Sequence, residues 1–428
     1  MMDGKAFPLP ETWKESSIGK VVVKAKQRDP RKNPDEVFQY VDVSAVSNTS
    51  FKITGAAPTL GSEAPSRARK AIETDDVLFA TVRPTLKRIA LVPPGLDGAI
   101  ASTGYCVLRC DKAKVEPGFL YSFLITNHFN ARMAGLERGA SYPSVRDSDV
   151  TASWFPLPPL PEQKKIAHIL STVQRAIEEQ ERIIQTTTEL KKALMHKLFT
   201  EGLRGEPQKQ TEIGPVPESW EVVELETTGD VVYGIQAAVA NNIAAVGTPI
   251  LTNKNITLDG GFDLEKLNYF VLTSKRHTAT ILQKGDILFN WRSGSKYHVG
   301  KTAYFDLEGE WVHSSFILRI RPAEKINGRY LFYYFNHLRE AEFFVKLQTY
   351  AINAKFNASA VNALPTAVPS REEQDEIAAV LDSAQQKINI AEEKHRALQD
   401  LFRTLLHELM TAEIRVHELE ISVGGSAA

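Results

Sequence analysis

The sequence is poor in cysteine and has no long apolar run. Its 428 residues contain two cysteines, Cys106 and Cys110, and no neighbouring Cys or His pair that would complete a zinc site. We expect both to be free thiols. No apolar run is long enough to cross a bilayer, and the N-terminus lacks the basic and then apolar stretches of a secretion signal. These absences predict a cytoplasmic protein.

The motifs of common catalytic sites are also missing. Neither Pro-Pro pair, at Pro93 or at Pro158, fits the Asn/Asp-Pro-Pro-aromatic motif of amino-methyltransferases. The glycines of residues 294–302 are one residue too far apart for a phosphate-binding loop. No His-x-x-x-His pair, nucleophile elbow or dinucleotide fingerprint occurs. We therefore expect no catalytic site, metal or cofactor in this chain.

The chain has no overall excess of positive charge, since its formal net charge is −1. The charge is unevenly distributed, however. Residues 1–155 hold 21 Lys+Arg against 17 Asp+Glu, whereas Glu, Gln and Lys crowd residues 162–200 and 373–411. A neutral total therefore does not exclude a basic face that binds nucleic acid.

The dominant feature that is present is an internal repeat. Residues 162–200 return as residues 373–411 with one fixed offset and no gap. Both copies lack Pro and Gly and carry apolar residues at alternating steps of three and four, the period of a coiled coil. The seam positions are Ile166, Leu170, Val173 and Ile177 in the first copy and Ile377, Leu381, Ile388, Leu398 and Leu405 in the second.

Two long helices of this kind need a partner, and each copy is the obvious partner of the other. Similar halves that bury the same stripe are most simply related by a pseudo-two-fold axis, which makes the helices antiparallel. The first copy places Gln180, Thr187 and Lys191 in its seam. The alternative is two unrelated amphipathic helices on separate cores, and the gapless repeat argues against it.

A second repeat marks the start of two globular domains. Pro8–Trp13 reads PLPETW and Pro215–Trp220 reads PVPESW, and proline-rich segments precede both helices. The predicted boundaries are a first domain at 1–158, a first helix at 159–200, a linker at 201–214, a second domain at 215–370, a second helix at 371–411 and a tail at 412–428.

Weaker similarities run in the same order through both domains. Residues 75–80 and 285–290 read as a turn and a short apolar strand, and residues 102–109 and 313–319 read as a second strand that ends in arginine. The segments between these landmarks differ almost completely. The predicted fold class is therefore α+β: two similar mixed α/β domains joined by two long antiparallel coiled-coil helices, one scaffold with two sets of loops.

At these residues the sequence resembles a known family. The run PLPEQKKIAHIL from Pro159 to Leu170, its echo at Gln374, Ile377, Ala378 and Leu381, and the paired P-x-P-x-x-W starts resemble the specificity subunit of type I restriction-modification enzymes. The resemblance covers nearly the whole chain. The second copy has Ser-Arg-Glu where the first has Pro-Leu-Pro, which leaves the start of its helix less sharply defined.

The resemblance implies a non-catalytic subunit that binds double-stranded DNA. Its two domains would be target recognition domains, each reading one half of a split and asymmetric sequence. The repeated helices would act as a ruler and dock two methyltransferase subunits, with restriction or motor subunits joining in the full complex. S-adenosylmethionine, ATP and Mg are expected on those partners and not on this chain.

Candidate DNA contacts come from clusters of cations beside amide and aromatic residues, because cations bind phosphates while planar and amide groups read base edges. The candidates are Lys24, Lys26, Arg67, Arg83, Lys87, Arg88 and Tyr142 in the first domain and Asn290, Arg292, Lys296, Tyr297 and Lys301 in the second. Any one of these could instead belong to a solvated surface, and Tyr142 could be packing. Residues 350–353 are a weaker candidate. Arg83 and Arg292 interest us most, because each follows the matching apolar strand within four residues.

Two alternative functions remain open at this point. A protein-interaction scaffold would use the two domains to bind proteins and the helices to separate them. A stand-alone DNA-modifying enzyme is opposed by the missing motifs. Unlike loop sets on matching scaffolds, with clustered Arg and Lys, favour the DNA reader.

Overall fold

The computed structural model describes residues 7–235, 243–244, 246–293, 295–350 and 357–420. The chain divides into two compact units, residues 1–181 with 393–428 (unit 1) and residues 182–392 (unit 2). Within the described residues, no helix is long and apolar enough to cross a membrane, and no cluster of His, Cys, Asp or Glu could hold a metal ion.

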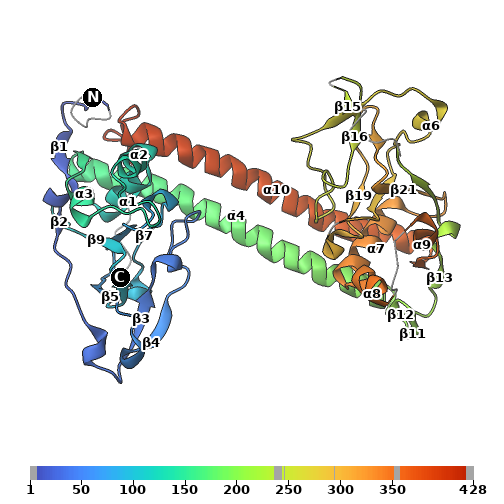
Figure 1. Cartoon of the computed structure of the whole chain (residues 1–428), viewed down its shortest axis with the longest axis horizontal. Helices are drawn as coiled ribbons and strands as arrows, with labels where there is room; N and C mark the ends of the chain where they lie inside the picture. Colours follow the sequence, from blue (N-terminus) through green and yellow to red (C-terminus); the bar gives the residue numbers. More distant parts are fainter. Residues whose placement is uncertain (1–6, 236–242, 245, 294, 351–356, 421–428) are drawn as a thin grey trace. The chain divides into compact units, whose positions relative to one another are not determined.

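Unit 1 contains three small sheets. Strand β1 (Lys14–Ser17) pairs with β10 (Trp154–Leu157). The inner sheet has the order β2 (Val22–Val23), β9 (Tyr105–Cys110), β6 (Val77–Ala80) and β7 (Ile89–Leu91). The outer sheet has the order β4 (Ala57–Leu60), β3 (Val37–Val41), β8 (Ile100–Ser102) and β5 (Ala68–Ala71). Helices α1 (Pro117–Ile125), α2 (Asn127–Gly135) and α3 (Asp147–Thr151) follow, and α4 (Leu160–Glu201) begins in this unit (Figure 1).

Unit 2 repeats this order. Strand β13 (Glu221–Glu224) pairs with β22 (Pro365–Val368). The inner sheet is β14 (Gly229–Tyr233), β21 (Ile317–Pro322), β18 (Ile287–Asn290) and β19 (Thr302–Tyr304). The outer sheet is β15 (Ile243–Ala244), β17 (Asn268–Phe270), β16 (Thr248–Leu251) and β20 (Val312–His313). The helices are α6 (Lys275–Thr278), α7 (Gly328–Glu340), α8 (Phe343–Tyr350), α9 (Ala358–Asn362) and the start of α10 (Arg371–Met410).

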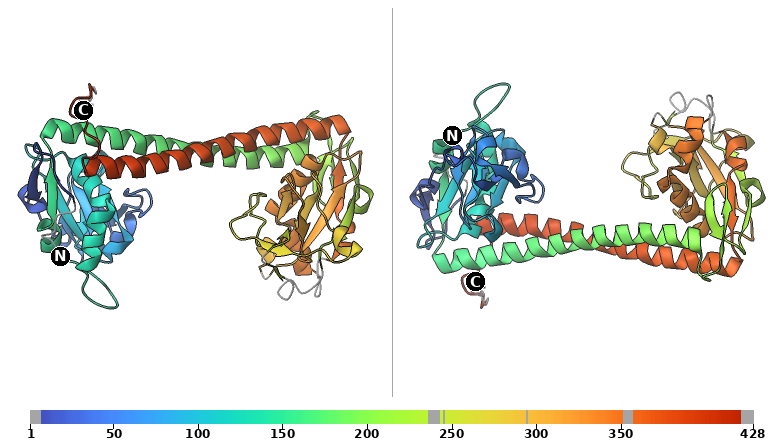
Figure 2. Two further views of the ribbon diagram at one scale, coloured as in Figure 1. Left: turned by 90° about the horizontal axis from the view of Figure 1, so that it is seen from above. Right: turned by 90° about the horizontal axis from the view of Figure 1, so that it is seen from below.

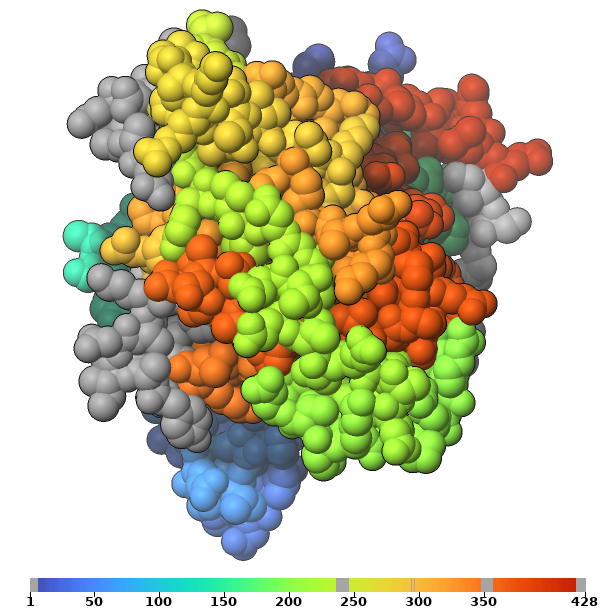
Figure 3. All heavy atoms as spheres, turned by 90° about the vertical axis from the view of Figure 1, so that its right-hand side faces the viewer, coloured from blue at the N-terminus to red at the C-terminus, as the bar shows by residue number. Residues whose placement is uncertain are grey.

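The segment between α4 and β13 belongs to unit 2 and forms a hairpin of β11 (Gln208–Thr211) and β12 (Gly214–Pro217). In the space-filling view of unit 2, lime-green residues from the part of the chain after α4 lie beside orange-red residues around the start of α10 (Figure 3). An ion pair of Arg204 with Glu376, at 3.1 Å, joins these two segments.

The inner sheets are buried on both faces. In unit 1, Val77 and Phe79 of β6 pack toward α1 and the long helices, whereas Leu78 and Ala80 pack toward the outer sheet. All four residues of β6 and all four of β18 are buried. A strand covered on both sides needs apolar residues at every position. This explains why both strands stood out in the sequence as continuous apolar runs.

In each unit, a part of α4 packs antiparallel against a part of α10. In unit 1, Ile166 near the start of α4 shares a core with Leu409 near the end of α10, and Glu181 lies 3.1 Å from His395. In unit 2, Leu198 shares a core with Ile377. Both views of Figure 2 show the helices side by side within each unit. The predicted fold class, two similar α+β domains with two long antiparallel helices, is confirmed.

The predicted seam faces inward along both helices. Ile166, Leu170, Ile177, Ile377, Leu381 and Ile388 are buried, and Val173, Leu398 and Leu405 are half-buried. The polar seam residue Lys191 is half-buried and donates a hydrogen bond to Gln385 at 2.5 Å. Polar pairs inside an apolar seam fix the register of two helices, because a slipped register leaves them without partners.

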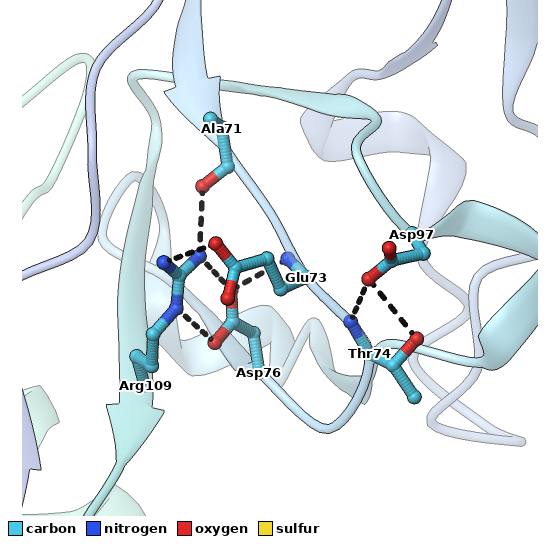
Figure 4. A network of polar contacts seen from close by, with 6 residues as sticks. All are labelled: Ala71, Glu73, Thr74, Asp76, Asp97 and Arg109. Carbon is cyan, nitrogen blue, oxygen red and sulfur yellow. Dashed lines mark hydrogen bonds and ion pairs between the residues drawn. The ribbon is translucent and has the colours of Figure 1, made fainter.

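A buried ion pair supports the turn before the central strand of each inner sheet. Arg109 donates to both carboxylate oxygens of Asp76, at 2.9 and 2.8 Å, and also to Glu73 at 2.7 Å (Figure 4). In unit 2, Arg321 donates to both oxygens of Asp286, each at 2.7 Å. The sequence comparison had matched Arg109 with Arg319, and that match is wrong by two residues. The strand ladder pairs Leu108 with Val77 and Ile320 with Ile287, which makes Arg321 the counterpart of Arg109.

Candidate DNA interface

The loop from β6 to β7 presents Arg83 at the surface of unit 1. Arg83 and Lys87 flank a short 3-10 turn, Pro84–Leu86, and both have left-handed backbones with φ of 49° and 51°. This conformation costs a residue with a side chain about 1 kcal/mol or more, so surrounding contacts must hold it. One such contact is the backbone N–H of Arg83, which donates to the carbonyl of Pro143 at 2.7 Å.

Tyr142 is presented beside Arg83 by a second loop. Arg138 and Ser144 exchange backbone hydrogen bonds at 2.9 and 3.0 Å, which closes the loop around the tyrosine. The guanidinium of Arg83 lies 5.3 Å from the centre of the Tyr142 ring, and the tyrosine is 72% exposed. Tyr142 is therefore a surface residue held beside a cation and not part of the packing.

Unit 2 has a similar pair after its own central strand. Arg292 is exposed, and its guanidinium lies 5.9 Å from the ring of Phe316, which is 42% exposed. The neighbouring indole of Trp291 donates to the carbonyl of Ser315 at 2.8 Å and ties the two loops together. Phe316 was not among the sequence-based candidates, because it lies inside a segment that the sequence analysis interpreted as a strand.

Two further cations of unit 1 line a surface hollow of about 410 Å³. Lys24 and Lys26 are exposed, and neither ammonium has a partner within the described part of the chain. Lys70, in the same hollow, donates to Asp147 and to the carbonyl of Tyr105, both at 2.5 Å. The hollow therefore offers two unpaired ammonium groups, whereas the charge of Lys70 is already balanced.

Two other candidates of unit 1 also lie near the surface. Arg67 is exposed, without a hydrogen bond from its guanidinium in the described structure. Lys87 is half-buried and donates to the side chain of Asn127 at 3.1 Å. Arg67 is thus free to bind an anion, while Lys87 would have to leave Asn127 to do so.

The structure removes Arg88 from the candidate interface. Its guanidinium donates to the carbonyls of Val43, Ser44 and Val46 and so cross-links two loops of the domain. These carbonyls would lose their partner if Arg88 turned to solvent. Arg88 is a structural residue.

Asn290 and Lys301 in unit 2 are also internal, which corrects their selection as DNA contacts. Asn290 is fully buried and donates to the carbonyl of His298 at 2.8 Å. Lys301 is 7% exposed, and its ammonium donates to the carbonyls of Asn253 and Ile256 at 2.9 and 2.6 Å. Burial lowers the pKa of Lys301. Both side chains hold loops in place beneath the surface.

The structure describes the side chains of only some of the remaining candidates of unit 2. Tyr297 is 59% exposed. The side chain of Lys296 and those of residues 350–353 lie outside the described residues. Arg292 and Tyr297 are therefore the candidates that the structure places at the surface of this unit.

The two units share one buried framework and differ at their exposed edges. The outer sheets have a common three-stranded part, β4-β3-β8 in unit 1 and β17-β16-β20 in unit 2. The fourth strand is added at opposite edges, β5 beside β8 but β15 beside β17. The fold therefore defines a class of duplicated recognition proteins, in which one scaffold carries two unlike surfaces.

Comparison with known proteins identifies the family within this class. The family model described as type I restriction modification DNA specificity domain matches residues 10–187 and again residues 217–400. The chain belongs to this family, and the predicted resemblance is confirmed.

Similar proteins cover nearly the whole chain. The putative type I restriction enzyme MjaX specificity subunit of Methanocaldococcus jannaschii is 24% identical over 95% of both chains. The MjaVIII specificity subunit of the same organism is 26% identical over 96% of this chain and 95% of that one. A solved chain from a study of complex assembly and conformational transition of the type I R-M system is 29% identical, with a TM-score of 0.56, and covers 96% of this chain and 100% of that chain.

Proposed function

We propose that this chain is the DNA sequence-recognition subunit of a type I restriction-modification enzyme and that each unit reads one half of a split, asymmetric site. The observation that carries the proposal is the duplication of one buried framework beneath two unlike surfaces. Equal frameworks present loops in equivalent ways, and unlike loops select unlike sequences. Exposed Arg83 and Arg292, both beyond the central strand of an inner sheet, supply cations for the two half-sites.

The chain is proposed to position other subunits and not to catalyse. The relatives are named specificity subunits, and one solved relative comes from a study of complex assembly. We propose two methyltransferase subunits as partners, with restriction subunits in the larger complex. S-adenosylmethionine, ATP and Mg would be bound by those partners.

Unit 1 also has a hollow at its surface beside the long helices. A hollow of about 880 Å³ lies between α1–α2 and the long helices, with Phe51, Phe402 and Met410 among its apolar lining residues and Lys87 and Glu178 among its charged ones. An exposed apolar hollow beside charges is typical of a protein interface. Its apolar and charged lining supports the proposal of a protein partner at unit 1.

The proposal is tested by mapping methylation. The chain is co-produced with a type I methyltransferase subunit from the same organism, in a host that lacks adenine methylation, and methylated adenines are located across the host DNA. We expect a single motif with two unlike halves and a fixed gap, which is absent when the methyltransferase is produced alone. Methylation without a split motif, or none, would contradict the proposal and favour a protein-interaction scaffold.

A further inference from the structure

In both units an arginine just beyond the central strand of the inner sheet lies against an exposed aromatic ring. Arg83 follows β6, which ends at Ala80, and Arg292 follows β18, which ends at Asn290. The rings come from different segments. Tyr142 lies in the loop before α3, whereas Phe316 directly precedes β21. The same combination of groups is thus built twice, with the arginines on matching loops and the rings on unlike ones.

These two arginines differ from other ring-contacting arginines of the described chain. Arg329 lies 3.9 Å from the Tyr304 ring centre, but it is ion-paired with Asp306 at 3.0 Å. Arg415 lies over Trp13 and is ion-paired with Glu162 at 2.7 Å. In the described structure, the guanidinium groups of Arg83 and Arg292 make neither a hydrogen bond nor an ion pair. All five N–H donors of each therefore remain available.

A ring beneath a free guanidinium orients it, and orientation matters for bases more than for phosphates. Phosphate oxygens accept hydrogen bonds from many directions, so a flexible ammonium such as that of Lys24 can bind them well. Guanine offers O6 and N7 side by side in the major groove, a geometry that matches the planar fork of arginine. Restricting the fork before binding reduces the entropy lost when the two hydrogen bonds form. The left-handed backbone of Arg83 adds a further restriction.

We propose that Arg83 and Arg292 are specificity-determining residues, each of which reads one guanine through O6 and N7 in the major groove of its own half-site. Tyr142 and Phe316 hold the guanidinium planes and offer an apolar surface to the adjoining base, such as a thymine methyl group. This inference rests on the proposed function and deepens it. It requires a G·C pair in each half of the recognition sequence.

The test uses the full chain in complex with its methyltransferase and compares variants on a library of DNA sites. Arg83→Gln is expected to lose roughly tenfold or more of the discrimination at one G·C pair of one half-site. The other half-site should keep its sequence. Arg292→Gln should give the reciprocal result, and Arg83→Lys, which keeps the charge and loses the planar fork, should keep only part of the discrimination for guanine. Tyr142→Ala should weaken discrimination at the same base pair as Arg83→Gln.

Lys24→Gln is the matched control, because it removes one exposed cation from unit 1 without touching a ring. It should weaken binding to all sequences alike and leave the motif unchanged. If Arg83→Gln also weakens all sequences alike, or leaves the motif and its selectivity intact, the inference is overturned. The wild-type complex separates this failure from that of the proposed function, because a split wild-type motif supports the reader whatever the arginine variants do.

Discussion

The indole N–H of Trp13 donates a hydrogen bond to Oε2 of Glu162 at 3.1 Å, across 149 residues of sequence. Trp220 makes the same bond to Glu373 at 3.2 Å in unit 2. Each tryptophan begins a globular domain and each glutamate lies in the first turn of a long helix. In each unit, the repeat at the domain start therefore supplies the donor of this hydrogen bond, and the repeat along the helix supplies its acceptor.

Both glutamates are expected to be important for stability. Glu162 is 2% exposed and also accepts hydrogen bonds from Arg415, so Glu162→Ala leaves a buried indole N–H and a guanidinium without their acceptor. We expect a loss of about 3 kcal/mol in the free energy of unfolding, measured by urea denaturation. Glu373→Ala, whose partners are Trp220 and a backbone N–H, should lose about 1–3 kcal/mol. Glu392→Ala, on an exposed position of α10, should change stability by less than about 0.5 kcal/mol.

The segment after α10, which the sequence analysis described only as a tail, is expected to stabilise unit 1. Arg415 donates to both oxygens of Glu162 and to the hydroxyl of Thr12 at 2.9 Å. Ending the chain after Thr411 should therefore lower the melting temperature of unit 1, and Arg415→Ala should reproduce much of the loss. Removing only residues 421–428 is the control. Equal melting curves for the two truncations would contradict this role.

Acid is expected to destabilise unit 2 through His313. Burial, which removes water from the imidazole, lowers the pKa of His313 to about 4, and the nearby charge of Arg319 lowers it further. The hydrogen bond between Nδ1 and the carbonyl of Ile317 opposes this shift but is outweighed, and Nε2 has no partner among the described residues. In the unfolded chain the pKa returns to about 6.5. Below pH 6.5 this histidine therefore binds a proton in the unfolded chain but not in the folded chain. The free energy of unfolding falls as the pH drops toward 4.

The size of this effect can be measured as the slope of the free energy of unfolding against pH. One proton of difference lowers the free energy of unfolding by about 1.4 kcal/mol per pH unit, or about 3 kcal/mol over the whole window. His313→Gln should reduce the slope between pH 6.5 and 4 by about 1.4 kcal/mol per pH unit, whatever it does to stability at neutral pH. A slope from His337 should remain, because burial lowers the pKa of that histidine to about 4 as well. Replacement of the exposed His298 by Gln is the control. An unchanged slope for His313→Gln would show that other groups cause the acid sensitivity.

The repeated helices and domain starts could be predicted because their signals are local and duplicated. A coiled-coil period is visible in any one helix, and a fixed offset between copies needs no structure to detect. The strand match of Arg109 with Arg319 failed for a physical reason. A shift of two residues leaves every side chain on the same face of a strand, so the apolar pattern fits both registers. Only the hydrogen-bond ladder identifies Arg321.

The candidate site was less predictable than the fold. Arg88, Asn290 and Lys301 have the residue types of DNA contacts, yet backbone carbonyls from distant segments take their hydrogen bonds. A sequence shows which side chains carry donors, but not which loop carbonyls the fold brings to them. Phe316 was missed for a related reason, because its exposure depends on how its loop leaves the sheet and not on its neighbours in the sequence.

Lengthening both long helices is expected to change the gap between half-sites. Seven residues inserted after Glu181 and after Glu392 keep the seam in register and add about 10 Å to each helix. At 3.4 Å per base pair the methylated motif should gain roughly three base pairs in its gap, with both halves unchanged. Five-residue insertions, which turn the seam by about 140° away from its partner, should reduce methylation. A motif that keeps its original gap after the seven-residue insertions would refute the helices as a spacer.

The exposed lysines of unit 1 are expected to control how DNA binding depends on salt. Lys24 and Lys26 have no partners among the described residues, so they can displace counterions from two phosphates. The double variant Lys24→Gln, Lys26→Gln should reduce the slope of log K against log salt by about 2 and weaken binding on every sequence to the same extent. Lys301→Gln could not replace this double variant. The buried Lys301 ammonium holds a loop in place, so its loss would alter the folded structure and not only the contact with DNA. Phosphate contacts normally weaken between about 50 and 200 mM salt. If the affinity for DNA does not change over this range, the basic surface is not the source of the binding energy.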